Sequence, residues 1–254
     1  MKDFLKTICI EAGELTLKYK HKDSALKIDA KSEKDFVTEA DLAVEKLLVE
    51  RILAKYPAHS ILGEETGAHA GSEYRWIIDP IDGTNCFMHG HPFYSISIAI
   101  EKGDTLELAA VYAPVLGELF MAQRGKGATL NDVPIAVSET TETNNAMVAT
   151  GFACLRENKA KQGLKLFCDV VPHVRDVRRH GSAAMDVCYV ACGRFDFYWE
   201  SYLNIYDVAA GRLILEEAGG RLTDFSGGQT KLYSEVAASN GVIHSELLRL
   251  LNKR

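Results

Sequence analysis

The stretch WIIDPIDGT, residues 76–84, ends an apolar run with Asp79 and Asp82, two acids three positions apart. Carboxylates at the end of a buried strand are unfavourable unless another group compensates their charge. Pro80 fixes its own φ and has no N–H to donate, whereas Gly83 allows a sharp turn and the close approach of another group. If a helix begins near Gly83, its free N–H groups form an anion site beside the two acids. A divalent cation that holds a phosphate at this turn would offset the desolvation.

The turn alone leaves two interpretations open, because Asp-Gly is a common turn dipeptide. Glu64 follows the short apolar segment 60–63, and Asp207 lies at the start of an apolar segment with helical spacing. Each acid has an ordinary explanation by itself, as a surface residue or as a favourable charge at a helix N-terminus. Together, these oxygen ligands favour Mg²⁺ or Mn²⁺. His89 and His91 are interpreted as loop residues, since a zinc site would need further ligands that are not apparent.

Composition excludes several functional classes. The chain has 254 residues, of which 47% are hydrophobic and 25% charged, as in ordinary globular proteins. Its formal net charge of -6 argues against general nucleic-acid binding. No apolar run approaches the ~20 residues of a membrane span, and the N-terminus lacks the pattern of a signal peptide, so a cytoplasmic location and no membrane partner are expected. The six cysteines include no C-x-x-C pair, and we expect no structural disulfide.

Hydrophobic periodicity predicts the fold class. In the first half, helical spacing predicts helices and short apolar or alternating segments predict strands of a mainly antiparallel sheet. The expected helices are 4–20 and 39–56, the second capped by Thr38, and the expected strands are 60–63, 75–79, 94–101, 106–114 and 117–124. The second half alternates, with strands 147–152, 194–200, 221–225 and 236–240 and helices 157–170, 182–192, 206–218 and 244–252. We therefore predict an α+β protein with a layered α/β/α/β/α sandwich.

Domain boundaries are weakly marked. No linker, repeat or low-complexity segment interrupts the chain, so residues 1–254 are expected to form a single catalytic unit. A soft boundary near residue 136 separates a metal-binding and catalytic half, 1–136, from a substrate-pocket half, 137–254.

Four short motifs carry a resemblance to a known family. They are GEE at 63–65, DPIDGT at 79–84, RRHGSAAMD at 178–186 and YDVAAG at 206–211. Their types and order resemble the inositol monophosphatase family of metal-dependent sugar and polyol phosphatases, and the third motif is especially like the bacterial members. Two departures stand out: Asn85 and Cys86 replace the usual Thr and Asn, and Tyr206 replaces the usual Trp.

The resemblance implies a role for particular residues. The implied metal ligands, for two or three Mg²⁺ ions or Mn²⁺ as a substitute, are Glu64, Asp79, the carbonyl of Ile81, Asp82 and Asp207. The implied catalytic residues are Asp41, which pairs with Thr84 to activate water, and Glu64. The implied substrate-binding residues are Asp82, Gly83, Thr84, Arg178, Gly181, Ala183, Glu200 and Asp207.

The implied activity is Mg²⁺-dependent hydrolysis of inositol-1-phosphate by direct in-line attack of a metal-activated water. Fructose-1,6-bisphosphatase and 3′(2′),5′-bisphosphate nucleotidase activities are alternatives, although the Lys-Glu pair typical of the nucleotidases after DGT is absent. An alternative of another class is a non-catalytic metal- and phosphate-binding regulatory module. Such a module has no need of Asp41 and Thr84, whose presence favours the enzyme. The resemblance also implies Li⁺ inhibition and a homodimer, for which the strands within 94–124 offer a candidate face.

Overall fold

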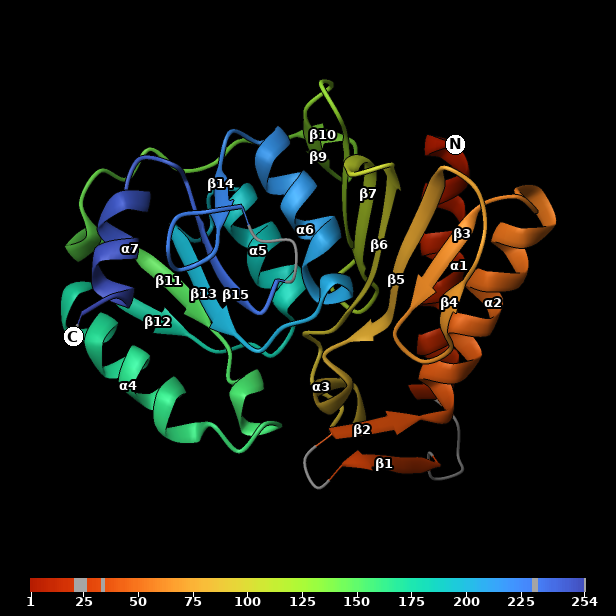
Figure 1. The fold of residues 1–254 in the computed structure, drawn as a ribbon, viewed down its shortest axis with the longest axis horizontal. Helices are drawn as coiled ribbons and strands as arrows, with labels where there is room; N and C mark the ends of the chain where they lie inside the picture. The colour runs from red at the N-terminus through yellow and green to blue at the C-terminus, as the bar shows by residue number, and fades with distance from the viewer. Residues whose placement is uncertain (21–26, 33–34, 230–232, 254) are drawn as a thin grey trace.

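The protein is described by a computed structural model that covers residues 1–20, 27–32, 35–229 and 233–253 (Figure 1). Its helices are α1 (Lys2–Lys20), α2 (Glu39–Lys55), α3 (Thr84–Met88), α4 (Ala160–Val170), α5 (Ala183–Ala191), α6 (Ile205–Glu217) and α7 (His244–Leu251). Three short 3₁₀ turns are η1 (Thr143–Asn145), η2 (Ala153–Leu155) and η3 (Val171–His173).

The strands form two large sheets and a separate hairpin. The hairpin pairs β1 (Ile28–Ser32) with β2 (Asp35–Thr38). The first sheet has the order β10-β9-β8-β7-β6-β5-β3-β4. Its strands are β3 (Ser60–Gly63), β4 (Gly67–His69), β5 (Tyr74–Asp82), β6 (Ser95–Lys102), β7 (Thr105–Ala113), β8 (Glu118–Gln123), β9 (Ala128–Leu130) and β10 (Val133–Pro134). All its neighbouring pairs are antiparallel except β3 and β5.

The second sheet belongs to the C-terminal half and has the order β12-β11-β13-β15-β14. Its strands are β11 (Met147–Thr150), β12 (Asp176–Arg178), β13 (Phe197–Ser201), β14 (Arg221–Thr223) and β15 (Glu235–Ser239). The pairs that β11 makes with β12 and β13 are parallel, and the other two pairs are antiparallel.

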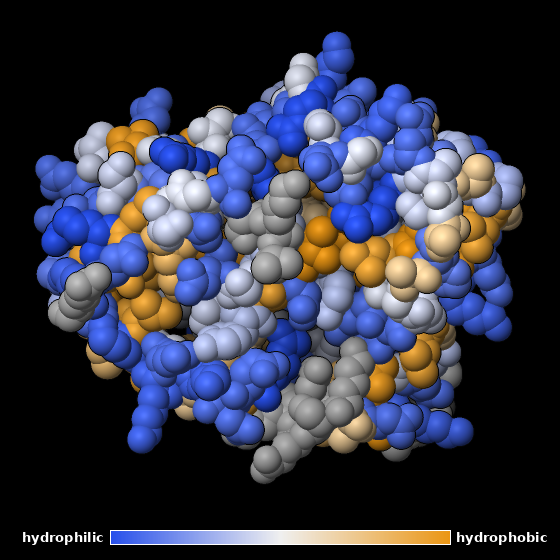
Figure 2. All heavy atoms as spheres, viewed as in Figure 1, coloured by the Kyte–Doolittle hydropathy of each residue, from blue (hydrophilic) through white to orange (hydrophobic). Residues whose placement is uncertain are grey.

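Five layers follow one another across the molecule (Figure 1). Helices α1 and α2 cover one face of the first sheet, α5 and α6 lie between the sheets, and α4 and α7 cover the outer face of the second sheet. Each junction is filled by buried apolar side chains. The side of the molecule seen in Figure 2 is mostly hydrophilic, as expected when most apolar side chains are buried between the layers. The predicted α+β sandwich is confirmed.

Some expectations need correction. The helix predicted at 157–170 corresponds to α4, which begins at Ala160, after the turn η2. Within the segment 94–124, β6 and β7 are covered on both faces by the chain itself, because α1 packs on one side of these strands and α6 packs on the other. Every residue of β6 except Lys102 is buried within the chain. The cysteines are all free, as expected. Within the described residues, no helix is long and apolar enough to cross a membrane.

A buried histidine makes stability sensitive to pH. His244 is 1% exposed, its Nε2 lies 2.9 Å from Thr223 Oγ1, and its Nδ1 lies 2.8 Å from Ser239 Oγ. Burial, followed by the charge of Arg221, lowers the pKa of His244 to about 4. In the unfolded chain His244 becomes protonated near pH 6.5, whereas in the folded chain it stays neutral down to about pH 4. The contribution of His244 to stability is therefore lost as pH decreases from 6.5 to about 4.

We expect His244→Gln to remove this component of the pH dependence. His244 should contribute a loss of about 1–3 kcal/mol to the free energy of unfolding between pH 7.5 and pH 4.5, after allowance for solvent screening. The buried acids, whose pKa is raised, contribute in the opposite sense in all variants, so the change is compared between proteins. Urea unfolding at the two pH values measures the total change, which should be more favourable by about this amount in His244→Gln and the same as the wild type in the control His89→Gln, an exposed position. An equal change in all three proteins would contradict the expectation.

Candidate active site

A bulge in β5 brings two acids onto one side of the first sheet. Asp79 pairs with Ser97 and Asp82 pairs with Ser95, so three steps along β5 match two steps along β6. Residues three apart on a regular strand point to opposite faces, and the extra residue of a bulge cancels that alternation. Gly83 then turns the chain with a φ of +96°, and a Cβ there would lie 2.9 Å from the carbonyl oxygen of Gly181. Helix α3 begins at the next residue, as the sequence led us to expect.

Asp207 completes a cluster of three buried carboxylates. Each of Asp79, Asp82 and Asp207 offers an oxygen, and these oxygens all lie within 4.8 Å of one another. Asp207 comes from the first turn of α6, where its Oδ2 accepts a hydrogen bond of 2.6 Å from the N–H of Asn204 in a capping box. The side chains therefore come from two segments more than a hundred residues apart and are fixed by a strand bulge and a helix cap.

The electrostatics of the cluster call for a cation. Burial, and then the charges of Glu64, Asp82 and Asp207, raise the pKa of Asp79 well above its usual value. Burial and the charge of Asp82 likewise raise the pKa of Asp207. Burial raises the pKa of Asp82 to about 7, although hydrogen bonds from Ser182 and Ala184 oppose the shift. Three buried acids with so little compensating positive charge fit a hard divalent ion held by carboxylate oxygens.

The other predicted ligands lie at the same place. Glu64 follows β3 and lines the same cavity as the three acids. The carbonyl oxygen of Ile81 accepts a hydrogen bond of 3.1 Å from Thr84 Oγ1 and retains a second lone pair. The N–H of Ile81 donates to Asp79 Oδ1 at 3.0 Å, which fixes that carboxylate. The residues present thus fit the Mg²⁺ or Mn²⁺ ions that the sequence motifs imply.

Asp41 and Thr84 meet beside the cluster. Thr84 Oγ1 lies 3.2 Å from Asp41 Oδ1. The other oxygen of Asp41 accepts from Thr38, at 2.9 Å from the backbone nitrogen and 2.5 Å from the hydroxyl, in the capping box of α2. Asp41 is fully buried, and burial raises its pKa while the Thr38 hydrogen bonds oppose the shift. A hydroxyl next to an immobilised carboxylate can pass on a proton from a bound water.

The cluster forms the floor of a cavity of about 350 Å³. Beyond the residues already named, the cavity is lined by residues from the hairpin, from the loop after β11, and from α5, β13 and the segments next to them. These residues are Phe36, Gly83, Asn85, Gly151, Phe152, Ala153, Leu155, Arg156, Arg179, Gly181, Ala183, Asp186, Glu200 and Leu203. Of the predicted substrate-binding residues, all but Arg178 are therefore brought together.

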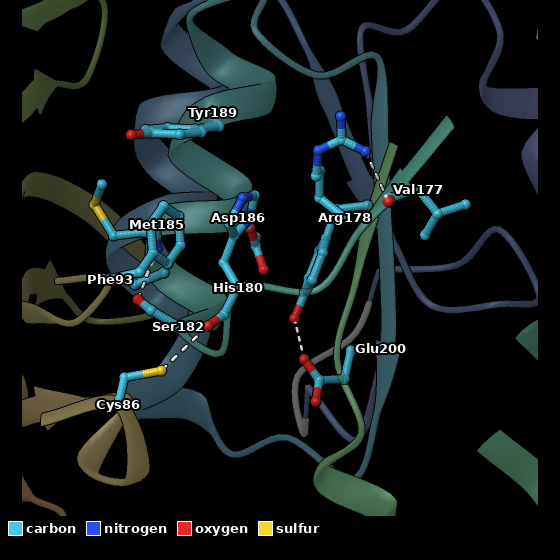
Figure 3. A network of polar contacts seen from close by, with 12 residues as sticks. Cys86, Phe93, Val177, Arg178, His180, Ser182, Met185, Asp186, Tyr189 and Glu200 are labelled. Carbon is cyan, nitrogen blue, oxygen red and sulfur yellow. Dashed lines mark hydrogen bonds and ion pairs between the residues drawn. The ribbon is translucent and has the colours of Figure 1, made fainter. Parts of the chain in front are cut away.

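Arg178 does not line this cavity. Its guanidinium pairs with Asp176 at 2.7 Å. It also donates to the carbonyl of Val177 at 3.0 Å (Figure 3). Arg179, the next residue, is at the cavity instead, together with Arg156. From the sequence, Arg179 is expected only as part of a basic cluster with Arg175 and Arg178 that could furnish a second anion pocket, and Arg156 and Asp186 were missed. The motif RRHGSAAMD contains Arg179 and Asp186, whereas nothing in the pattern around Arg156 marks it.

Glu200 is buried and fully engaged. Its Oε1 accepts from the N–H of Ala153 at 2.7 Å, and its Oε2 accepts from the hydroxyl of Tyr198. Burial raises its pKa despite these bonds. Glu200 is therefore not a solvated acid at the end of β13, and it anchors the loop 151–156 that forms part of the cavity wall.

The departures from the family motifs leave the acids in place. Cys86 Sγ donates to the carbonyl of His180 at 3.1 Å, so it joins α3 to the segment before α5 (Figure 3). Asn85 is exposed at the cavity rim. The carbonyl of Tyr206 accepts from Ser97 Oγ at 3.2 Å, which fixes the start of α6 against β6. His89 and His91 are exposed and do not line the cavity.

Comparison with known proteins identifies the family. The inositol monophosphatase family model matches residues 1–254, and the chain belongs to that family. A putative Nus factor SuhB of Neisseria meningitidis serogroup B is 41% identical over 244 residues, covering 95% of this chain and 94% of the relative. An inositol-1-monophosphatase of Mesorhizobium japonicum is 37% identical over 231 residues, covering 90% and 87%. The crystal structure of the extragenic suppressor protein suhB from Bartonella henselae superposes with a TM-score of 0.94 at 35% identity, covering 99% and 98%.

Proposed function

We propose that the protein is a Mg²⁺-dependent phosphatase that hydrolyses inositol-1-phosphate to inositol and phosphate. The observation that carries the proposal is the buried cluster of Asp79, Asp82 and Asp207 next to the pair of Asp41 and Thr84. The first group fits metal binding, and the second is needed only for turnover. Membership of the family and the name of the Mesorhizobium relative support a phosphatase and this choice of substrate.

Each part of the site has a task in an in-line displacement. Bound Mg²⁺ would lower the pKa of water and neutralise charge on the phosphoryl oxygens. Thr84, held by Asp41, accepts a hydrogen bond from the attacking water and directs its proton towards the buried carboxylate. The amides at the start of α3, beginning with Gly83 and Thr84, point to the phosphate. Gly181 and Ala183 lie close to Asp82 and leave room for the polyol, and no covalent phosphoenzyme is needed.

Phosphate release from a substrate panel tests the proposal. The panel is inositol-1-phosphate, fructose-1,6-bisphosphate, 3′-phosphoadenosine-5′-phosphate and histidinol phosphate, each with Mg²⁺ and with chelator. Mg²⁺-dependent release from inositol-1-phosphate well above the rest is expected. A preference for fructose-1,6-bisphosphate or the nucleotide would retain the chemistry and replace the substrate. Arg156 and Arg179 at the cavity would suit the second phosphate of either compound.

A regulatory role without turnover is the second candidate. The relatives named Nus factor SuhB favour it, since that name describes no hydrolysis. Mg²⁺ binding without phosphate release from any panel member would establish this second candidate. A cytoplasmic location, a homodimer and inhibition by Li⁺ belong to the phosphatase proposal, and full activity at high Li⁺ concentration would remove the last of them.

A further inference from the structure

Asp186 is a cavity carboxylate outside the metal cluster. It lies in the first turn of α5, is 1% exposed and lines the cavity (Figure 3). Its Oδ1 lies 2.8 Å from Nδ1 of His180. Across the described parts of the chain, His180 is the one hydrogen-bonding partner of this carboxylate, through Oδ1, and Asp186 borders the cavity.

His180 is held firmly in place. Its ring stacks on Phe93 with centroids 4.2 Å apart and on Phe195 with centroids 5.4 Å apart. Its carbonyl accepts the hydrogen bond from Cys86. Burial raises the pKa of Asp186 to about 7, and the hydrogen bond with His180 opposes the shift. In the ionised form the carboxylate can only accept, and Nδ1 of this ring is then the donor. The fixed ring thereby fixes the orientation of the carboxylate, including the oxygen that it does not contact.

Asp186 has more acceptor capacity left than Glu200. Each oxygen of Glu200 already accepts one hydrogen bond from the protein and keeps one lone pair, whereas Oδ2 of Asp186 accepts none from the described residues. A hydroxyl group of a molecule bound in the cavity can donate to this oxygen. The cavity also holds the phosphate-directed residues, so the donor and the phosphate can belong to one substrate.

We propose that Asp186, positioned by His180, accepts a hydrogen bond from a hydroxyl group of the substrate and selects polyol phosphates over esters without hydroxyls. The inference rests on the proposed phosphatase function and adds to it a residue that determines specificity. Neutral polyol hydroxyls are donors of the right kind, and an anionic group at the same place would be repelled by the carboxylate.

The experiment compares inositol-1-phosphate with phenyl phosphate, which has the same ester group and no hydroxyl. In Asp186→Asn, an amide N–H₂ can replace the acceptor oxygen with little change in volume. We expect kcat/KM for inositol-1-phosphate to fall about 10–100-fold, mainly through KM, because a hydrogen-bonding site that loses its partner discriminates strongly. The value for phenyl phosphate should stay within about twofold.

Two further variants separate specificity from structure. His180→Phe keeps a ring between Phe93 and Phe195 but removes Nδ1, and it should show a smaller loss with the same selectivity for the hydroxylated substrate. Asp196→Asn is the matched control, since Asp196 is a buried carboxylate that bonds Ser138 and Met147 and does not line the cavity. Asp196→Asn should change the melting temperature and leave unchanged the ratio of kcat/KM for inositol-1-phosphate to kcat/KM for phenyl phosphate.

Failure of the inference is distinguishable from failure of the proposed function. Equal losses on both substrates in Asp186→Asn, or no loss on either, would overturn the role of Asp186. A wild type that hydrolyses neither ester would overturn the phosphatase. In that case calorimetric binding of inositol-1-phosphate in Mg²⁺ still decides: about tenfold weaker binding to Asp186→Asn supports the inference, and equal binding refutes it.

Discussion

Asp79→Asn is expected to make the metal-free protein more stable and the Mg²⁺-loaded protein less stable than the wild type. Without metal, burial raises the pKa of Asp79, and the charges of Glu64, Asp82 and Asp207 raise it further. An acid whose pKa is higher in the folded state lowers stability as pH rises above its unfolded value, so the neutral amide relieves repulsion at pH 7. The amide oxygen can still accept from Ile81.

The expected size is large enough to measure. Relief of about 1–2 kcal/mol would raise the melting temperature of the chelated protein by about 3–6 °C. Saturating Mg²⁺, at about 100 times its dissociation constant, should stabilise the wild type by about 2.7 kcal/mol. Most of this stabilisation by Mg²⁺ should be absent in Asp79→Asn. The kcat of the phosphatase should also be lower in this variant by about 10³-fold or more.

Differential scanning calorimetry with chelator and with Mg²⁺ gives the four melting temperatures. Asp196→Asn serves again as the control. It should lower the melting temperature both with chelator and with Mg²⁺, because its amide N–H₂ would face the donors Ser138 Oγ and Met147 N–H. It should retain the full rise in melting temperature on addition of Mg²⁺. Destabilisation of chelated Asp79→Asn, or an undiminished Mg²⁺ shift, would contradict the metal site.

The sequence was informative where periodicity and burial coincide. The helical spacing of residues 4–20 and 39–56 and the alternation in 94–101 match α1, α2 and β6, since each packs a well-defined apolar face. The hairpin of β1 and β2 was not predicted. Residues 27–30 alternate polar and apolar side chains, but four positions are too few to identify a strand, and all four are exposed. This hairpin is relevant to function, because Phe36 of β2 lines the cavity.

The acids of the site were predicted from motifs, whereas their convergence required the structure. Nothing local in DPIDGT shows that a bulge places Asp79 and Asp82 on one side of the sheet. The hydrogen bond between Thr84 and Asp41 joins positions 43 residues apart. The two residues meet because α2 and α3 both pack against β2.

Arg178 illustrates the sensitivity of such predictions to a single residue. Asp176 and Arg178 are two positions apart on β12, so they share a face and form an ion pair. Arg179 follows the end of that strand and reaches the cavity. A strand of three residues carries too little periodicity to decide between neighbours, and the same holds for Arg156 in the turn after η2.

Thr84→Val is expected to abolish most turnover while metal binding persists. Thr84 Oγ1 is the hydroxyl between Asp41 and the carbonyl of Ile81, at 3.2 and 3.1 Å. Valine retains the shape and removes the group that accepts from the attacking water. Loss of a positioned proton acceptor should lower kcat about 10²–10⁴-fold, with KM within a few-fold. Initial-rate kinetics of phosphate release measure both constants.

Thr84→Ser supplies the matched control, because it restores the hydroxyl at the start of α3. Its kcat should return to within about tenfold of the wild type, the remainder reflecting a freer rotamer. Asp41→Asn should resemble Thr84→Val in kcat. All three variants should keep the Mg²⁺-dependent rise in melting temperature, since none of them removes a carboxylate of the cluster. Full turnover in Thr84→Val would place the proton acceptor elsewhere, and a lost Mg²⁺ shift would mean that the hydroxyl acts through the carbonyl of Ile81 on the metal.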